Sequence, residues 1–281
     1  MFNPEPCKLE VYTAAWRSGS LDARAQLVVP SPAPIEYVVG VVGGGLVGHA
    51  AFALDIWWPM CARFRCALAH FDVASDPPPA TRAHDPGRNA TVGSGQALLS
   101  LLDTLARSAR RPELSRAKLA LFGFSATGSF ALTFAVQYPE RTLTAVRYHS
   151  HLRGLEVDTM ALARVPVLMV ASTGDSTAGV EDTRSLWQRG RRSGAPWALA
   201  VETGRAHVSL DSWLDASDLI WHWIEAIGSP RTRAGYANGW HGDPDTRTIA
   251  RVRVGVSDEK RSWLPDSVTA ESWRRLNRGQ P

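Results

Sequence analysis

A short apolar run that leads into small residues around a serine constrains this chain more than any other feature. The run at 118–122 predicts a buried strand, and the run at 130–138 predicts a helix that Pro139 ends. Gly123 and Ser125 lie in the connection between them. A strand, a tight turn with a central serine and a helix form the arrangement of a nucleophile elbow. In such a turn the serine backbone is strained and its hydroxyl stands above the edge of the sheet.

The usual motif of such a turn, G-x-S-x-G, is only partly present. Thr127 stands where the second glycine is expected, and Gly128 follows one position later. A β-branched residue is expected to crowd the turn, so the motif is moderately specific. Taken alone, it also fits a serine that does no more than cap the following helix.

Strand and helix patterns alternate along most of the chain, which predicts an α/β fold with a doubly wound, mostly parallel sheet. Two earlier runs, at 8–15 and 24–29, alternate between apolar and polar residues and predict an N-terminal antiparallel hairpin. We expect residues 1–230 to form this domain and residues 231–281 to form a C-terminal extension packed on the same domain.

Composition and charge narrow the partners that we expect. The net charge of +4 comes from arginines that are scattered rather than gathered in a stripe, which argues against nucleic-acid binding. No apolar run is long enough to cross a membrane, and no secretory signal precedes the first strand, so we expect a cytoplasmic protein. The glycines at 43–45 lack a nucleotide-binding pattern, and we expect no cofactor.

The cysteines and histidines give little sign of a metal site. The three cysteines form neither a CxxC pair nor a cluster with histidine, although Cys61 and Cys66 are close enough in sequence to pair. No set of histidines and carboxylates has the spacing of metal ligands. We therefore expect no metal.

Ser125, Asp175 and His207 each follow the end of a predicted parallel strand, in that chain order. Because the carboxyl ends of parallel strands meet at one edge of the sheet, these side chains are expected to lie together. A serine hydroxyl needs a base to become a nucleophile, and the base needs a carboxylate to orient it. The three residues in this order are far more specific than the turn alone.

Other residues compete for these roles. Asp182 and Asp211 are carboxylates within reach in sequence, but both fall within predicted helices. His149 ends a strand close to Ser125 and is an alternative base, although it would require a different chain order. His222 lies between two tryptophans and is predicted to be structural.

With these pieces in place, the chain resembles an α/β-hydrolase over about residues 8 to 228. The segments that carry the resemblance are 43–45, 123–128, 166–175 and 204–207. The resemblance implies that Ser125 is the nucleophile, that His207 is the general base and then the acid, and that Asp175 holds the imidazole. No organic cofactor or metal is implied.

The resemblance also implies an oxyanion hole. One donor would be the backbone N–H of Ala126, and the other would come from the glycine loop, with Gly44 and Gly45 as the candidates. The family often has a histidine before the first glycine of this loop, where this chain has Val42.

Substrate contacts are predicted at two positions. Only residues 150–164 separate the strand after the elbow helix from the strand before Asp175, which is too short for a large cap domain. Trp57 and His149 are then the candidate substrate-binding residues, with core packing as an equally good account of Trp57.

Together these features lead us to expect a serine hydrolase that cleaves a carboxylic ester through an acyl-enzyme intermediate, with a small-molecule ester or acyl compound as its partner. A thioesterase, a peptidase or an acyltransferase would use the same triad, because the acceptor is chosen by pocket features that the sequence does not reveal. A catalytically silent ligand binder of the same fold is the alternative from another class. The sequence sets no oligomeric state.

Overall fold

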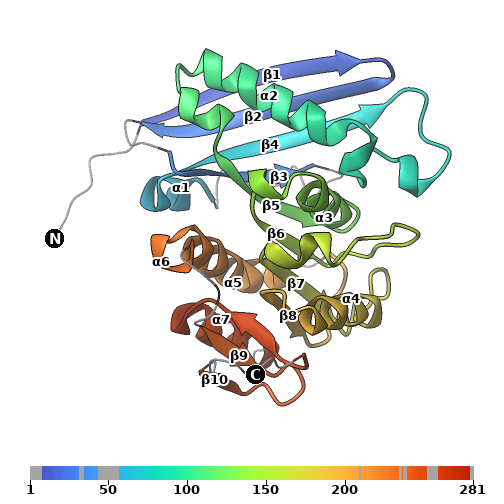
Figure 1. The fold of residues 1–281 in the computed structure, drawn as a ribbon, viewed down its shortest axis with the longest axis vertical. Coiled ribbons are helices and arrows are strands. Elements are labelled where there is room, and N and C mark those ends of the chain that lie inside the picture. Colours follow the sequence, from blue (N-terminus) through green and yellow to red (C-terminus); the bar gives the residue numbers. More distant parts are fainter. Residues whose placement is uncertain are drawn as a thin grey trace.

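The computed structural model describes residues 8–31, 35–43, 57–208, 210–233, 236, 239–251 and 259–278. An eight-stranded sheet runs through it in the order β1-β2-β4-β3-β5-β6-β7-β8, from the top of Figure 1 downward. The strands are β1 (Lys8–Ser18), β2 (Leu21–Ser31), β3 (Tyr37–Val42), β4 (Cys66–Ser75), β5 (Lys118–Phe124), β6 (Thr142–Tyr148), β7 (Val167–Ser172) and β8 (Trp197–Glu202).

The sheet is mostly parallel. Every pair from β4 and β3 through β8 is parallel, while β1 pairs antiparallel with β2 and β2 pairs antiparallel with β4. The predicted doubly wound sheet and the N-terminal antiparallel hairpin are therefore confirmed. The hairpin strands are longer than the sequence pattern suggests, with 11 residues each, and they meet in a tight turn at Gly19, whose φ is +56°.

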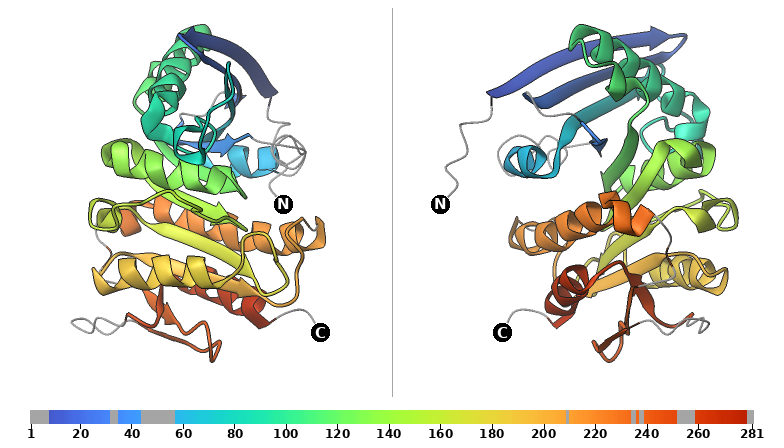
Figure 2. Two further views of the ribbon diagram at one scale, coloured as in Figure 1. Left: turned by 90° about the vertical axis from the view of Figure 1, so that its right-hand side faces the viewer. Right: turned by 60° about the vertical axis from the view of Figure 1, so that its left-hand side comes forward.

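Helices cover both faces of the sheet (Figure 2). Helices α2, α3 and α4 pack on one face, and α1, α5 and α7 pack on the other. No helix in the described part of the chain combines the length and the apolar character that crossing a membrane requires. The helices are α1 (Trp58–Phe64), α2 (Ser94–Ser108), α3 (Thr127–Gln137), α4 (Glu181–Arg192), α5 (Leu210–Gly228), α6 (Pro230–Arg233) and α7 (Ser267–Arg278).

The central strands are apolar along their whole length because both of their faces are buried. On β5, Leu119 and Leu121 contribute to the core under α2, α3 and α4. Ala120 and Phe122, on the alternate face, contribute to the core under α1 and α5. This burial holds the strand that leads into Ser125 rigidly between two packed layers.

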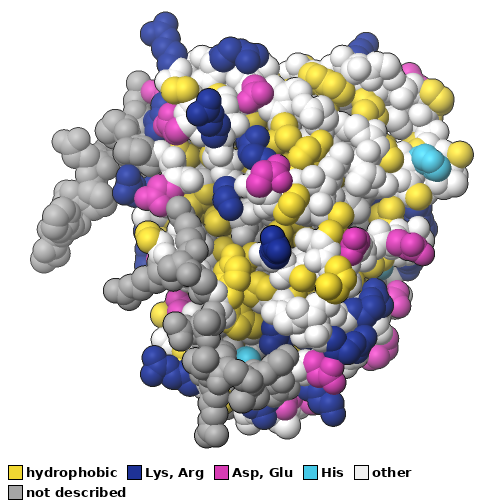
Figure 3. All heavy atoms as spheres, viewed as in Figure 1, with side chains coloured by type: hydrophobic (Ala, Val, Ile, Leu, Met, Phe, Trp, Pro, Cys, Tyr) yellow, Lys and Arg dark blue, Asp and Glu magenta, His cyan; other side chains and the backbone are white. Residues whose placement is uncertain are grey.

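No cap domain stands over the carboxyl edge between β6 and β7. The connection carries one short 3-10 helix, Ala161–Arg164, and adds no helical layer. The predicted absence of a large cap is confirmed. On the face drawn in Figure 3, the described Lys and Arg side chains lie scattered among acidic and apolar ones.

The C-terminal elements cover the free edge of β8. A small antiparallel sheet is made of β10 (Ile249–Arg251), β9 (Trp240–Gly242) and β11 (Ser262–Leu264), and α7 packs against β8 and α5. Leu199 on β8 donates its N–H to Ser262 Oγ at 2.8 Å, and its carbonyl accepts from Trp273 Nε1 at 2.7 Å. These side chains take the place of a further strand. The division of the chain at residue 230 stays a prediction.

The two cysteines close in sequence are not joined. Cys61 on α1 and Cys66 at the start of β4 are both free thiols buried in the core. The disulfide that their spacing allowed is not formed in this structure.

Candidate active site

The turn after β5 holds Ser125 in a left-handed backbone conformation, with φ of +53°. Such a conformation is strained for a residue other than glycine and persists only where the surroundings hold it. Here the N–H of Ser125 donates to the Tyr148 carbonyl at 3.0 Å, which ties the turn to β6. A Cβ on Gly123 would lie 2.2 Å from the carbonyl oxygen of Thr127, so only glycine lets α3 approach this closely.

Thr127 stabilises the turn that its side chain was expected to crowd. Its hydroxyl accepts from the N–H of Phe124 at 3.1 Å. The same hydroxyl lies 3.0 Å from the Phe124 carbonyl and 3.2 Å from the Val42 carbonyl on β3, the two oxygens to which it can donate. The side chain is therefore a clamp between the end of β5, the start of α3 and the neighbouring strand. The position tolerates a β-branched residue because the hydroxyl has these buried partners.

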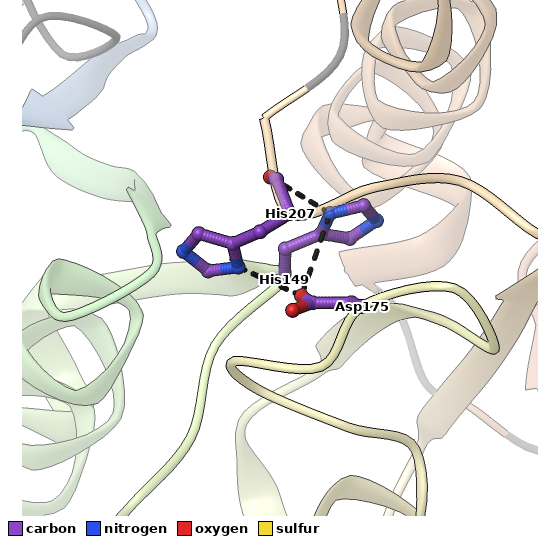
Figure 4. Close-up of side chains that lie close together, drawn as sticks. All are labelled: His149, Asp175 and His207. Atoms are coloured by element: carbon purple, nitrogen blue, oxygen red, sulfur yellow. Dashed lines mark hydrogen bonds and ion pairs between the residues drawn. The ribbon is translucent and has the colours of Figure 1, made fainter.

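The three residues predicted from chain order lie together at the carboxyl edge of the sheet. His207 Nε2 is 2.8 Å from Ser125 Oγ, and His207 Nδ1 is 2.8 Å from Asp175 Oδ2. Figure 4 shows the imidazole of His207 turned toward the carboxylate of Asp175, with His149 beside them. The Asp175 side chain is fully buried, whereas 19% of the His207 side chain is exposed.

Asp175 is held as a carboxylate. Burial acts to raise its pKa, but the hydrogen bond from His207 and those from the N–H groups of Ala178 and Thr177 outweigh burial, and the pKa falls below the ordinary value. A carboxylate at Nδ1 places the ring proton on that nitrogen. Nε2 then presents its lone pair to the Ser125 hydroxyl, which is the arrangement that a general base needs.

His149 lies behind the Asp175 carboxylate rather than on an open surface. Its side chain is fully buried, and its ring stacks on that of Tyr148 with centroids 4.2 Å apart. Its Nε2 is 2.7 Å from Glu202 Oε2, and its Nδ1 is 3.2 Å from the His207 carbonyl oxygen. The structure thus brings His207, not His149, against Ser125.

Trp57 lies in the core. Its side chain has no exposed surface, and it makes edge contacts with Phe122 and Trp221, each at a centroid distance of 5.2 Å. Core packing therefore accounts for Trp57, which has no exposed surface with which to contact a substrate. The ring fills the space between β5 and α5.

The predicted oxyanion hole is only partly within the described residues. Ala126 is the residue that precedes α3, with helical φ and ψ of −57° and −41°. The first N–H groups of a helix have no acceptor within the helix itself, which leaves them available to an anion. Gly44 and Gly45 lie outside the described residues.

The competing residues lie elsewhere. Asp182 is exposed in the first turn of α4, and Asp211 belongs to α5. His222 on α5 bonds through Nδ1 to Ser272 Oγ at 2.8 Å and so connects α5 to α7. None of these contacts involves Ser125.

Sequence patterns did not reveal Glu202 as part of this region. It is the last residue of β8, buried with 2% of its side chain exposed. The signal that the sequence offered was an acidic residue, Glu202, at the end of an apolar strand, where it reaches the carboxyl edge of the sheet.

The cluster of His149, Asp175 and His207 also has the composition of a metal site. Their ligand-type atoms lie within 4.8 Å of one another. The shortest of these contacts is the hydrogen bond between His207 and Asp175, and a cation between them would have to break it. The arrangement suits proton transfer better than metal binding.

Comparison with known proteins shows which solved structures share this fold. No protein-family model matches the chain, and no curated protein matches it in sequence. Among solved structures, a cold-adapted esterase from an Arctic intertidal metagenomic library is similar, with 12% identity, a TM-score of 0.54, and coverage of 80% of this chain and 97% of that one. A 2-hydroxy-6-oxo-6-phenylhexa-2,4-dienoate hydrolase from Rhodococcus is 14% identical over 76% of this chain and 99% of its own, with a TM-score of 0.52.

A putative dipeptidyl aminopeptidase IV from Bacteroides ovatus is also similar, with 15% identity and a TM-score of 0.52 over 72% of this chain. The chain spans only 33% of the length of that protein. All three structures are α/β-hydrolases. At these identities they establish the fold of this chain and leave its reaction to be argued from the site.

Proposed function

We propose that this chain, which has the α/β-hydrolase fold, is a serine hydrolase that cleaves a carboxylic ester through an acyl-enzyme intermediate. One observation carries the proposal: Ser125 Oγ, the His207 ring and Asp175 Oδ2 form a continuous hydrogen-bonded chain with both contacts at 2.8 Å. The base is oriented by a buried carboxylate, and the nucleophile stands on a strained turn.

In the first half of the reaction, Ser125 Oγ attacks the ester carbonyl carbon while its proton passes to His207 Nε2. The negative charge on the carbonyl oxygen is stabilised by the Ala126 N–H, and the second donor stays the one that the sequence predicts, at Gly44 or Gly45. The tetrahedral intermediate collapses, the bond to the alcohol oxygen breaks, and His207 gives that oxygen the proton.

In the second half, His207 takes a proton from water and the resulting hydroxide attacks the acyl-enzyme. The acid leaves and the proton returns to Ser125. Asp175 balances the positive charge that forms on His207 in both halves. These steps call for no metal and no organic cofactor.

The ester as substrate is part of the proposal. The similar structures include an esterase, a dienoate hydrolase and a putative aminopeptidase, so one fold serves several bonds. A thioester would pass through the same steps, and an alcohol in place of water would make the reaction an acyl transfer. We expect a small-molecule ester or acyl compound.

Hydrolysis of p-nitrophenyl esters of increasing acyl length tests this proposal. Ser125→Ala is expected to lose activity by at least about 10⁴-fold and to lose labelling by a fluorophosphonate, because it removes the hydroxyl that meets His207 Nε2. Ser108→Ala is the matched control, since Ser108 lies exposed at the end of α2. A wild-type protein that is inert on every ester and also resists the fluorophosphonate would overturn the proposal in favour of a silent ligand binder.

A further inference from the structure

His149 and Glu202 form a buried pair directly behind the catalytic carboxylate, and the mechanism above does not use them. The exposed fraction is 0% for the His149 side chain and 2% for that of Glu202. Neither side chain can touch the substrate from this position. The His149 ring nevertheless reaches both Asp175 and the main chain of His207.

Both ring nitrogens of His149 face oxygen atoms. On one side Nδ1 lies 3.2 Å from the His207 carbonyl oxygen and 3.7 Å from Asp175 Oδ2. A carbonyl oxygen cannot donate, and Asp175 is a carboxylate, so Nδ1 must carry a proton. On the other side Nε2 lies 2.7 Å from Glu202 Oε2, a distance that requires a proton between the two atoms.

This proton lies between His149 Nε2 and Glu202 Oε2, and whichever of the two atoms holds it, Nδ1 keeps its own proton. Glu202 therefore occupies Nε2 and leaves Nδ1 as the donor to the His207 carbonyl. The pair carries no net charge, which makes its burial tolerable. The hydrogen bond with Glu202 at Nε2 is thus what keeps His149 in the form that donates from Nδ1.

The donated hydrogen bond fixes the backbone that carries the general base. His149 itself is held in a left-handed conformation, with φ of +45°, and its N–H donates to the Val170 carbonyl at 2.9 Å on β7. Its ring stacks on Tyr148 at an interplanar angle of 11°. A rigid ring anchored on β6 and β7 thus holds the His207 carbonyl, which lies in the loop after β8.

We propose that His149, whose Nε2 is held by Glu202 and whose Nδ1 donates to the His207 carbonyl, is a positioning residue that fixes the main chain of His207 and so keeps its Nε2 within hydrogen-bond distance of Ser125. This inference rests on the proposed function. It replaces substrate binding as the role of His149. The pair acts through His207, and we therefore expect it to affect turnover rather than substrate affinity.

Steady-state kinetics on a p-nitrophenyl ester test the role of the pair. The double variant His149→Phe/Glu202→Met removes both polar partners together, which avoids leaving a buried charge unpaired. We expect kcat to fall about 30- to 100-fold, the effect of displacing a catalytic group by a fraction of an ångström, with KM unchanged within about twofold. His222→Phe, which removes a half-buried histidine with a single side-chain partner outside the site, is the control and should leave both constants unchanged.

The single variant Glu202→Gln keeps the shape of the side chain and can keep a hydrogen bond to Nε2 of His149. Its amide can donate to Nε2 of a neutral His149, so Nδ1 keeps its proton and the loss of kcat should be smaller, about three- to tenfold. This variant carries the test if the double variant does not fold. An unchanged kcat in either folded variant, or a change in KM without a change in kcat, would overturn the proposal.

Nitrogen NMR of ¹⁵N-histidine-labelled protein separates this inference from the proposed function, because it needs no substrate. Nδ1 of His149 should be protonated in the wild-type protein and in Glu202→Gln. The Nδ1–H of His207 should exchange faster with water in the double variant than in the wild type or in His222→Phe. If the wild type hydrolyses no ester but these signals hold, only the proposed function fails. A wild-type His149 whose Nδ1 carries no proton would overturn the inference even if the ester is cleaved.

Discussion

At the scale of single residues, strain and buried polar groups gather at the carboxyl edge of the sheet. Ser125 and His149 both have positive φ, and each directly follows one of the adjacent strands β5 and β6, which the hydrogen bond from the Ser125 N–H to the Tyr148 carbonyl joins. Each such conformation costs of order 1–3 kcal/mol and needs surrounding contacts to hold it. The hydrogen bonds of Thr127, Asp175 and Glu202 supply these contacts.

A third histidine, His151, is expected to make stability depend on acid. Burial and the positive charges of Arg153, Arg88 and Arg82 lower its pKa to about 4, so the folded protein holds this ring neutral while the unfolded chain takes up a proton near pH 6.5. Between pH 4 and about pH 6.5, the folded state therefore binds fewer protons than the unfolded state does. Stability should therefore fall as pH drops from about 6.5 to 4, by about 2–3 kcal/mol from this residue.

Urea unfolding of wild type and His151→Gln at pH 7, 5 and 4 measures this effect. The free energy of unfolding of His151→Gln should rise relative to that of the wild type as pH falls, whereas His84→Gln, which changes an exposed histidine in the 3-10 helix Arg82–His84, should follow the wild type. If the free energies of unfolding of the wild type and of His151→Gln change in parallel across this pH range, His151 is not held neutral in the folded protein.

At the scale of elements, close approach of helices to the sheet depends on positions without a side chain. Gly128 at the start of α3 leaves space for Ser150, since a Cβ there would lie 2.5 Å from the Ser150 hydroxyl. Gly190 plays the same part between α4 and β8, because a Cβ there would lie 2.0 Å from the indole of Trp197. Trp197 is fully buried and bonds through Nε1 to the Val165 carbonyl, so it has no space into which to move.

Gly190→Ala is therefore expected to destabilise the protein, although alanine is the better helix former. Overpacking against a fixed indole costs about 1–3 kcal/mol and should lower the free energy of unfolding by that amount. Arg189→Ala, at the exposed neighbouring position of α4, is the control and should change stability by less than about 0.5 kcal/mol. A Gly190→Ala protein as stable as the wild type would mean that α4 can shift away from β8.

At the scale of the whole molecule, the C-terminal elements protect the last strand of the sheet. An exposed strand edge invites pairing with another chain. Ser262 and Trp273 occupy the hydrogen-bonding groups of Leu199 at this edge, and Trp263, Leu264 and Trp273 are buried in the core beneath them. Residues 231–281 thus contribute side chains to the hydrophobic core and also cover the edge of β8.

A chain that ends at residue 230 is expected to self-associate and to melt at least about 10 °C lower than the full chain, since loss of one buried tryptophan alone costs about 3–5 kcal/mol. Trp273→Ala tests the same contact without truncation, and Val268→Ser, at an exposed position of α7, is its control. Size-exclusion chromatography and thermal unfolding report the two effects. A truncated chain that stays monomeric with an unchanged melting temperature would show that the extension is dispensable to the fold.

The sequence by itself determined the class of fold and the three residues of the candidate triad. Apolar periodicity marks each strand and helix, and parallel strands bring their carboxyl ends to one edge, so Ser125, Asp175 and His207 could be placed together from chain order alone. Only the tertiary structure decided that Trp57 packs in the core, that Thr127 clamps the turn, and that His149 faces Glu202. Local patterns set the edge that a side chain reaches, but its partner depends on contacts across the fold: His149 and Glu202 are 53 residues apart, and their contact exists only because β6, β7 and β8 lie side by side.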